Sequence, residues 1–337
     1  MHTKAPTMKD VAELAGVSVQ TVSCVVNGTG TISPKTQARV LKAIKQLRYR
    51  RDPIARSMRT RQTRLVGLLV LDITNPVLSV IASAVEAAAH TEDYKVILYN
   101  VSMNPRRERE CLETSAEGLV DGLIIVNTVD PANTLTFLQE EAISAVLIDC
   151  QTAPDIPCVA VDNVQAAYMA ASHAIERGHR RIAHITGSST LLMAHQREQG
   201  YLQALDDHDL AYRRVLVSPD SRWDYRAGYS TTQQLLRGSD LPTAIFAASD
   251  QMAIGACRAI SEAGLKVPDD ISVIGFDDIE AAAFATPPLT TIRQPFVEIA
   301  RTAFNLLMQV LSGEHLETTQ IVLPPELIVR QSVKELK

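Results

Sequence analysis

Apolar residues follow two different spacings along this chain of 337 residues. Up to Leu47 they recur every three or four positions, which is the spacing of a helix that buries one face. From Leu65 onward, short apolar runs such as LVGLLVL alternate with longer segments of helical periodicity. The pattern therefore predicts a small all-helical unit followed by a much larger α/β unit.

The small unit carries a clear set of helix start and stop signals. Thr7, with Asp10 three positions later, forms a capping box at the start of the first helix. Gly16 supplies a left-handed residue that ends this helix, and Ser18 caps a second one that Gly28 closes. The dipeptide Ser33-Pro34 begins a third helix, as cap and first helical residue. Two short helices joined by a glycine turn, with a third behind them, predict a helix-turn-helix unit.

One face of each predicted helix is apolar, which indicates a small common core. Its expected members are Met8, Val11, Ala12, Leu14, Ala15, Val22, Val25, Val26, Val40, Ala43, Ile44 and Leu47.

The second helix begins with small polar residues, Ser18 to Thr21, ahead of its apolar positions. A helix that enters the major groove needs small polar residues at this end so that it can approach base edges. Gln20 has the amide for a bidentate adenine contact, and Val19 can pack on a thymine methyl group. The alternative is an ordinary pair of helices in an unrelated core.

Charge separates the two units sharply. Residues 1–64 hold 13 lysines and arginines against three acidic residues, although the whole chain has a net charge of −5. A basic amino-terminal segment followed by an acidic remainder favours a polyanion, such as nucleic acid, as the partner of that segment. A solvated basic tail is the alternative, but such tails contain few apolar residues and this segment contains many.

The segment from Tyr49 to Arg64 is a candidate linker with six arginines and few apolar residues. Asp52 as cap and Pro53 as first residue predict a short helix to about Arg59. A helix this short is not stable alone in water, so we expect it to form only when held by a partner. A disordered basic tether is the other interpretation.

The large unit contains two successive series of alternating strand and helix patterns, which predict parallel sheets covered by helices. Two series of similar length indicate two Rossmann-like subdomains with a ligand cleft at the carboxyl ends of their strands. We expect the chain to cross between subdomains near residues 149–162 and near 288–294. The run ELIVRQSV is expected to form a closing strand. The predicted domains are thus 1–50 (head), 51–64 (linker) and 65–337 (core).

Composition excludes several classes of protein. The apolar fraction of 46% is typical of a globular protein, and no apolar run is long enough for a membrane helix. The first twenty residues lack a signal-peptide pattern, so we expect a cytoplasmic protein without a membrane partner. The five cysteines are scattered without metal-ligand spacing, so we expect reduced thiols, no metal and no cofactor.

The runs MKDVAELAGVSVQTVSCVVNG and ISPKTQARVLKAIKQLRYRRDPIARSMRT resemble the headpiece of the lactose/galactose repressor (LacI/GalR) family of bacterial transcription regulators. The resemblance implies that Val19, Gln20 and Cys24 read bases. It also implies phosphate contacts, which we expect from Thr7, Ser18, Thr21, Ser23, Asn27 and Thr36. Arginine is common in the family where this chain has Cys24, and cysteine cannot make the bidentate guanine contact. Cys24 therefore leaves the operator sequence undetermined, but the resemblance still implies double-stranded DNA as the partner.

The resemblance extends to the linker, which matches the family's hinge helix. That helix pairs with its twin in the dimer and wedges an apolar side chain into the minor groove. Met58 occupies the wedge position in this sequence, Ala55 lies one turn earlier, and Arg56 lies between them as a further minor-groove candidate.

The body resembles the family's periplasmic-binding-protein-like core, most specifically in ERGHRRIAHITG, the run from PTAIFAASDQ to VIGFDD, and PPLTTIRQP. Guanidinium and carboxylate groups suit vicinal hydroxyls, and an indole face suits a sugar ring. Many members carry aromatic residues where this chain has Val77 and Leu78, and a purine-binding relative is polar at Leu191 and Met193. These departures favour a sugar, sugar acid or sugar phosphate over a nucleobase. The implied effector-binding positions are Val77, Leu78, Asp149, Asp162, Leu191, Met193, Arg197, Trp223, Ser249, Asp250 and Asp277.

The predicted function is a sequence-specific DNA-binding transcriptional repressor controlled by a small sugar-like effector, with no catalytic residues. The sequence ends at Lys337 without a leucine heptad, so we expect a homodimer and a near-palindromic operator. A solute-binding transport protein would share the body but not the basic head. An enzyme is a further alternative, although the sequence contains no G-x-G-x-x-G, Walker, G-x-S-x-G or H-E-x-x-H motif.

Overall fold

The computed structural model describes residues 6–49, 62–149, 155–188, 191–212, 214–219 and 222–336. The chain divides into two compact units, Met1–Thr63 and Arg64–Lys337. None of the helices in these described ranges has the length and apolar character needed to cross a membrane.

The first unit contains the three predicted helices, α1 (Met8–Ala15), α2 (Val19–Asn27) and α3 (Pro34–Leu47). The capping box is present, because the Thr7 side chain accepts from the Asp10 backbone and the Asp10 side chain accepts from the Thr7 backbone. Gly16 ends α1 with a φ of 60°, a left-handed conformation that glycine adopts without steric cost. The local signals of the sequence therefore give the helix bounds of this unit correctly.

The three helices enclose a small apolar core. Most residues expected in it are buried or packed against it, whereas Leu14 is 46% exposed and lies outside. Met8 packs against it as expected, and two residues beyond the predicted set, Val17 and Tyr49, also pack there.

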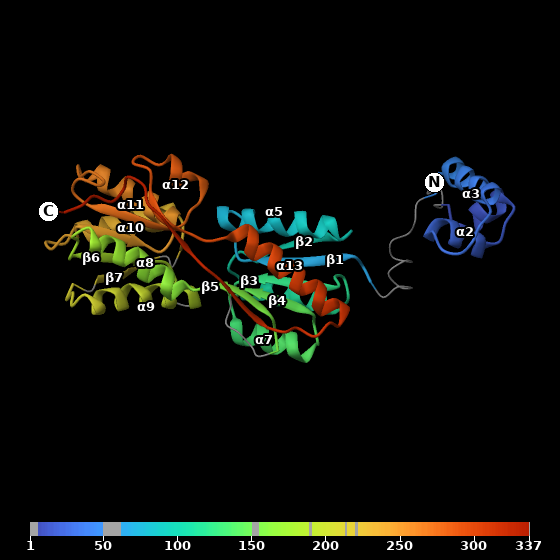
Figure 1. Ribbon diagram of the computed structural model, residues 1–337, viewed down its shortest axis with the longest axis horizontal. Coiled ribbons are helices and arrows are strands. Elements are labelled where there is room, and N and C mark those ends of the chain that lie inside the picture. Colours follow the sequence, from blue (N-terminus) through green and yellow to red (C-terminus); the bar gives the residue numbers. More distant parts are fainter. Residues whose placement is uncertain are drawn as a thin grey trace. The chain divides into compact units, whose positions relative to one another are not determined.

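The second unit contains two six-stranded sheets, as the alternating pattern predicts (Figure 1). All strands of the first sheet are parallel. Their spatial order is β11 (Gln320–Leu323), β5 (Cys158–Val161), β4 (Ala145–Ile148), β3 (Gly122–Val126), β1 (Leu65–Val70) and β2 (Lys95–Asn100). The helices of this subdomain are α5 (Pro76–Thr91), α6 (Pro105–Ala116), α7 (Pro131–Glu140) and α13 (Phe296–Ser312).

The second sheet is parallel except for one edge strand, which runs antiparallel to its neighbour. Its spatial order is β12 (Glu326–Ile328), β10 (Thr290–Arg293), β9 (Ser272–Asp277), β8 (Ala244–Ala247), β6 (Ile182–Thr186) and β7 (Arg214–Val217). The helices here are α8 (Asn163–Glu176), α9 (Leu192–Asp207), α10 (Tyr225–Leu236), α11 (Asp250–Glu262) and α12 (Glu280–Phe284).

The chain passes between the two sheets three times. It leaves the first sheet after β5, returns to the first subdomain after β10 by way of α13, and crosses again between β11 and β12. The first two passages agree with the crossings expected near residues 149–162 and 288–294, whereas the third was not expected from the sequence. Only one closing strand, in ELIVRQSV, was expected after residue 294, whereas β11 and β12 lie in different sheets.

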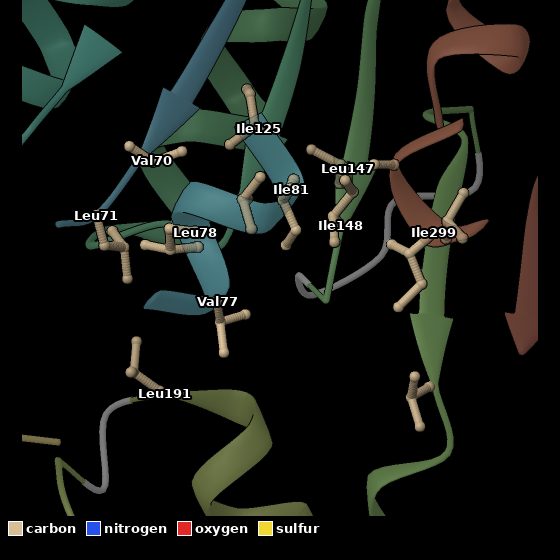
Figure 2. Packing of buried hydrophobic residues seen from close by; sticks show 14 of the residues in the cluster. Val70, Leu71, Val77, Leu78, Ile81, Ile125, Leu147, Ile148, Leu191 and Ile299 are labelled. Atoms are coloured by element: carbon tan, nitrogen blue, oxygen red, sulfur yellow. The ribbon is translucent and has the colours of Figure 1, made fainter. Parts of the chain in front are cut away.

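Buried aliphatic residues fill the space between the first sheet and its helices. Figure 2 shows Val70, Ile125 and Leu147 from the strands together with Leu78 and Ile81 from α5. Apolar residues of the second subdomain belong to the same cluster, so the packing is continuous across the two subdomains.

Candidate functional sites

The amino-terminal end of α2 is the exposed surface of the first unit that the sequence singled out. Ser18, Val19 and Gln20 are exposed, and Val19 retains 42% of its accessible surface. An exposed β-branched residue beside an exposed amide suits contact with base edges. Cys24 lies one turn further along α2 and is half-buried.

Several of the predicted phosphate-contacting hydroxyls also stabilise helix ends. The Ser18 hydroxyl accepts from the Thr21 backbone at 3.1 Å, and Asn27 Nδ2 donates to Ser23 Oγ at 3.0 Å. Thr36 donates its backbone N–H to the Ser33 hydroxyl in the same way. These groups are held in fixed positions, and their contact with phosphates stays a prediction.

One arginine of the basic head has a structural role. Nη2 of Arg39, on α3, donates to the carbonyl oxygens of Ala15 and Gly16 at the turn between α1 and α2. This contact satisfies carbonyls that the end of a helix leaves without intrahelical partners. Arg39 therefore fixes the turn that places α2.

The predicted hinge residues Ala55, Arg56 and Met58 lie outside the described residues. Their assignment stays a prediction from the sequence.

The second unit contains a cavity of about 540 Å³, lined by residues of both subdomains. Such a volume lies within the range of small-molecule sites, which is about 300–1,000 Å³. Nine of the eleven predicted effector-binding residues line it: Val77, Leu78, Asp149, Leu191, Met193, Arg197, Trp223, Ser249 and Asp277.

The other two predicted residues do not line the cavity. Asp162 caps α8, where its side chain accepts from the Gln165 backbone at 2.8 Å. Asp250 is fully buried, and its two oxygens accept from Thr291 Oγ1 and the Ile279 backbone. Both carboxylates follow strand ends, but each is engaged in stabilising the second subdomain.

Arg197 occupies the buried end of the cavity. Its Nε donates to Asn163 Oδ1 at 2.9 Å, and its Nη1 donates to the Ala248 carbonyl at 2.6 Å. Nη1 also lies 4.0 Å from Asp277 Oδ1, and the guanidinium carbon lies 3.7 Å from the centre of the Phe276 ring. This arrangement fixes the guanidinium in one orientation.

Two carboxylates end strands beside this arginine. Asp149 follows β4 with a φ of 49°, and Asp277 ends β9 with a φ of 115°. Short polar residues reach positive φ more readily than most, although a φ of 115° is strained for any side chain. Asp149 Oδ1 accepts from the Val161 backbone, and Asp277 Oδ1 accepts from Gln294 Nε2 at 2.8 Å.

Burial raises the pKa of both carboxylates, and that of Asp277 reaches about 6, although the Arg197 charge opposes the shift. Each acid is therefore protonated more readily than an exposed aspartate. At neutral pH the buried end holds one guanidinium and two carboxyl groups of weakened acidity.

Two polar groups of the cavity have no hydrogen-bond partner within the described residues. They are Trp223 Nε1, a donor, and Gln294 Oε1, an acceptor because Nε2 of the same amide faces Asp277. Both atoms are inaccessible to solvent, so they lie behind the surface of the cavity and are costly to the fold itself. Ser249 Oγ is already engaged, because it bonds the Trp223 carbonyl and the Met252 backbone.

Sequence reasoning missed several polar lining residues. Asp72, Asn127 and Gln294 directly follow or lie close after strands β1, β3 and β10, so the rule that selected Asp149 would have found them. Asn163, which orients Arg197, gave no such signal because it lies inside the first turn of a helix. The described residues contain no group of three or more histidine, cysteine or acidic side chains suited to a metal ion.

Two family models match the chain. Residues 7–52 match the description "bacterial regulatory proteins, lacI family", and residues 171–333 match a periplasmic binding protein-like domain. The chain is 37% identical over 336 residues to the HTH-type transcriptional repressor PurR of Histophilus somni (strain 129Pt), covering 98% of this chain and 99% of that protein.

Solved structures are similar over the same extent. The lac repressor dimer bound to operator and the anti-inducer ONPF has a TM-score of 0.88 and 30% identity, covering 98% of this chain and 100% of that one. A complex of the transcriptional regulator CelR with cellobiose has a TM-score of 0.73 and 31% identity, covering 97% and 99%.

Proposed function

This chain belongs to the lacI family of bacterial regulatory proteins, and we propose that it is a homodimeric repressor whose operator affinity is set by a small hydroxylated effector. The cavity of the second unit supports this proposal, because a buried Arg197 and two carboxylates belong to its lining of polar and apolar side chains. The relatives of this chain are transcriptional repressors, which agrees with the expectation of a non-enzymatic regulator acting on DNA in the cytoplasm.

The head reads the operator through α2. Val19, Gln20 and Cys24 contact base edges, while the hydroxyls and amides nearby contact phosphates and set the register. A two-fold protein requires a near-palindromic operator, since each head reads one half-site. Selection of bound duplexes from a random pool tests this assignment, and bound sequences without two-fold symmetry would contradict it.

The linker couples the two units as a hinge helix. In this proposal Met58 enters the minor groove and Ala55 allows the twin helices to pack closely. Met58→Gly is expected to reduce operator affinity and DNA bending together, which gel mobility of circularly permuted fragments measures. Unchanged bending would remove Met58 from this role.

The effector binds at the carboxyl ends of the strands, where Arg197, Asp149 and Asp277 meet hydroxyl groups. Sugars, sugar acids and sugar phosphates fit this chemistry, and the similar CelR structure is a cellobiose complex. The apolar Leu191 and Met193 leave the edge of a nucleobase with few hydrogen-bond partners. We propose that binding releases the operator, with a coupling free energy of about 1–3 kcal/mol.

The decisive experiment is a thermal-shift screen of sugars, sugar acids, sugar phosphates and purine bases, followed by operator binding with each hit. Arg197→Ala should abolish the effector response and leave operator binding near normal under conditions where the variant is folded. A retained response would exclude Arg197 from the site. Coupling is reciprocal, so operator DNA must weaken effector binding by the same factor.

A further inference from the structure

Arg64 is the first residue of the second unit and directly precedes β1. Its φ of 59° is a left-handed conformation, which costs free energy for any residue other than glycine. Such a conformation persists only where the surrounding contacts hold it. In the sequence Arg64 is also the last residue of the predicted linker, so the contacts that hold Arg64 fix the point at which the linker joins the core.

The backbone of Arg64 is held by the two strands that flank β1. Its N–H donates to Asp121 Oδ2 at 3.0 Å, and its carbonyl oxygen accepts from the Lys95 backbone at 2.9 Å. The Asp121 backbone in turn donates to the Leu65 carbonyl oxygen at 2.8 Å. Lys95 begins β2 and Asp121 directly precedes β3, so the start of β1 is fixed from both sides.

The Arg64 side chain adds contacts at the same place. Its guanidinium carbon lies 5.0 Å from the centre of the Tyr94 ring, where a cation is attracted by the ring face, and Nη1 donates to the Glu92 carbonyl oxygen at 3.2 Å. Burial, the charge of Asp121 and a hydrogen bond to that carboxylate raise the pKa of Tyr94, although the Arg64 charge opposes the shift. The Tyr94 hydroxyl therefore stays protonated and donates to Asp121. We call Arg64, Tyr94 and Asp121 the Arg64 clamp.

Two helices extend from the cavity to the Arg64 clamp. Val77, in the first turn of α5, lines the cavity, and Glu92 caps the other end of this helix of 16 residues, about 24 Å away. Phe296, the first residue of α13, also lines the cavity, and Phe304 of the same helix packs edge-on against Tyr94 with ring centres 6.4 Å apart. Figure 1 shows α5 and α13 side by side, and the two helices pack against each other. Rigid helices transmit displacements along their length, so a change at the cavity reaches Arg64 through both of them.

We propose that Arg64 is a positioning residue for operator binding, because the Arg64 clamp fixes the point at which the linker leaves the core and thereby sets whether both heads of a dimer can bind their half-sites together. Arg64 acts through its contacts within the core and not by contact with DNA. Without the guanidinium, the start of β1 is held less firmly and the linker begins from a less defined point. Operator affinity then falls, whereas the attraction of each head for phosphates does not. The inference rests on the proposed function, since it takes residues 51–64 to couple the head to the core.

The test compares two duplexes on the full-length protein by fluorescence anisotropy. One is selected by the wild type from a random pool, and the other is a scrambled duplex of the same length and composition. Arg64→Ala should lower the affinity for the selected duplex about tenfold and leave that for the scrambled duplex within about twofold of the wild type. Arg64→Lys keeps a cation that can lie over the Tyr94 ring, so it should recover most of the loss. A role in stability alone would not change the ratio of the two affinities in the folded protein.

Two further variants separate the clamp from the effect of charge. Arg109→Ala is the matched control, because the Arg109 guanidinium also lies over an aromatic ring of the first subdomain, 4.0 Å from the centre of Phe137. It removes one positive charge, as Arg64→Ala does, and should leave the ratio of the two affinities unchanged. Tyr94→Leu removes the ring without changing the charge of the protein, so it should lower the ratio as Arg64→Ala does. Urea unfolding shows which variants are folded under the binding conditions, and Arg64→Ala decides alone if Tyr94→Leu is not.

Wild-type affinity of Arg64→Ala for the selected duplex would overturn the inference and leave the proposed function intact. Equal losses on the two duplexes would also overturn it, since they would indicate that the Arg64 charge acts on DNA directly. A wild type that prefers no duplex contradicts the proposed function, and the inference with it.

Discussion

The guanidinium of Arg197 lies 4.0 Å from the carboxylate of Asp277, and the two side chains are 3% and 12% exposed. The pair joins α9 to the end of β9 at the buried end of the cavity. Arg197 therefore has two roles, since the groups that would recognise a ligand also compensate buried charge within the protein.

Arg197→Ala should be strongly destabilising. Removing one partner of a buried ion pair leaves the other charge uncompensated, at a cost of about 3–5 kcal/mol in the free energy of unfolding. Urea unfolding of the full chain measures this change. Arg181→Ala is the matched control, because the Arg181–Asp240 pair spans 3.5 Å with both side chains more than half exposed. We expect a loss below about 1 kcal/mol for the control, and similar losses for the two variants would contradict the role of Arg197.

His184 should make the second unit sensitive to acid. Its ring stacks between Tyr201 and Phe246, with Nδ1 at 3.0 Å from the Phe246 carbonyl. Burial lowers the pKa of His184 to about 4, although that hydrogen bond opposes the shift. Because the folded pKa lies below the unfolded value of about 6.5, the stability that the neutral ring contributes is present above pH 6.5 or so and is lost as pH falls toward 4.

The measurement for His184 is the free energy of unfolding between pH 4 and pH 7, compared for the wild type and His184→Asn. The variant should lose less stability over this window, by up to about 3 kcal/mol. Asp277, whose raised pKa of about 6 gives a contribution of opposite sign, is present in both proteins and cancels in the comparison. If the free energy of unfolding changed with pH by the same amount in both proteins, His184 would not titrate as described.

Gly228 should be intolerant of a side chain. A Cβ built at this position of α10 would overlap the Met252 carbonyl of α11, and one at Gly255 would overlap the Tyr225 carbonyl in return. The two helices therefore approach through their glycines. Gly228→Ala is expected to lower the free energy of unfolding by at least about 1–3 kcal/mol, as overpacking does. Gly238→Ala serves as control, since its nearest neighbour is the flexible Arg214 side chain at 3.1 Å, and an equal loss there would contradict the explanation.

Cys24→Arg should change which operator is bound. A guanidinium at this position of α2 can make the bidentate guanine contact that a thiol cannot, which is worth about 1–3 kcal/mol of discrimination. Selection from a random duplex pool should therefore give a guanine at one position of each half-site for the arginine variant. Cys24→Ser is the control, and its selected half-sites should not gain this guanine. Identical selected sequences for all three proteins would exclude residue 24 from base reading.

Local signals in the sequence were sufficient for the elements but not for all their connections. Thr7, Gly16 and Ser18 set helix ends through interactions within one turn, and each acts as predicted. The assignment of β11 and β12 to different sheets depends on pairing with β5 and β10, which lie far away in sequence. No local pattern distinguishes two such short strands.

The same distinction applies to the cavity. Polar residues directly after buried strands identified Asp149 and Asp277, because the carboxyl ends of parallel strands meet at one edge. The rule also selected Asp250, which the structure uses as an acceptor for Thr291 and Ile279. Whether such a carboxylate faces the cavity or the protein depends on neighbours from other elements, and the sequence does not show them.

The proposed function requires that the basic head bind duplex DNA through the phosphates. The most direct test is the affinity of the purified full-length protein for duplexes selected from a random pool, measured by fluorescence anisotropy from low to high salt. We expect tight binding at low ionic strength that weakens steeply and linearly in a plot of log affinity against log salt concentration. Failure to bind any duplex at low ionic strength would contradict it.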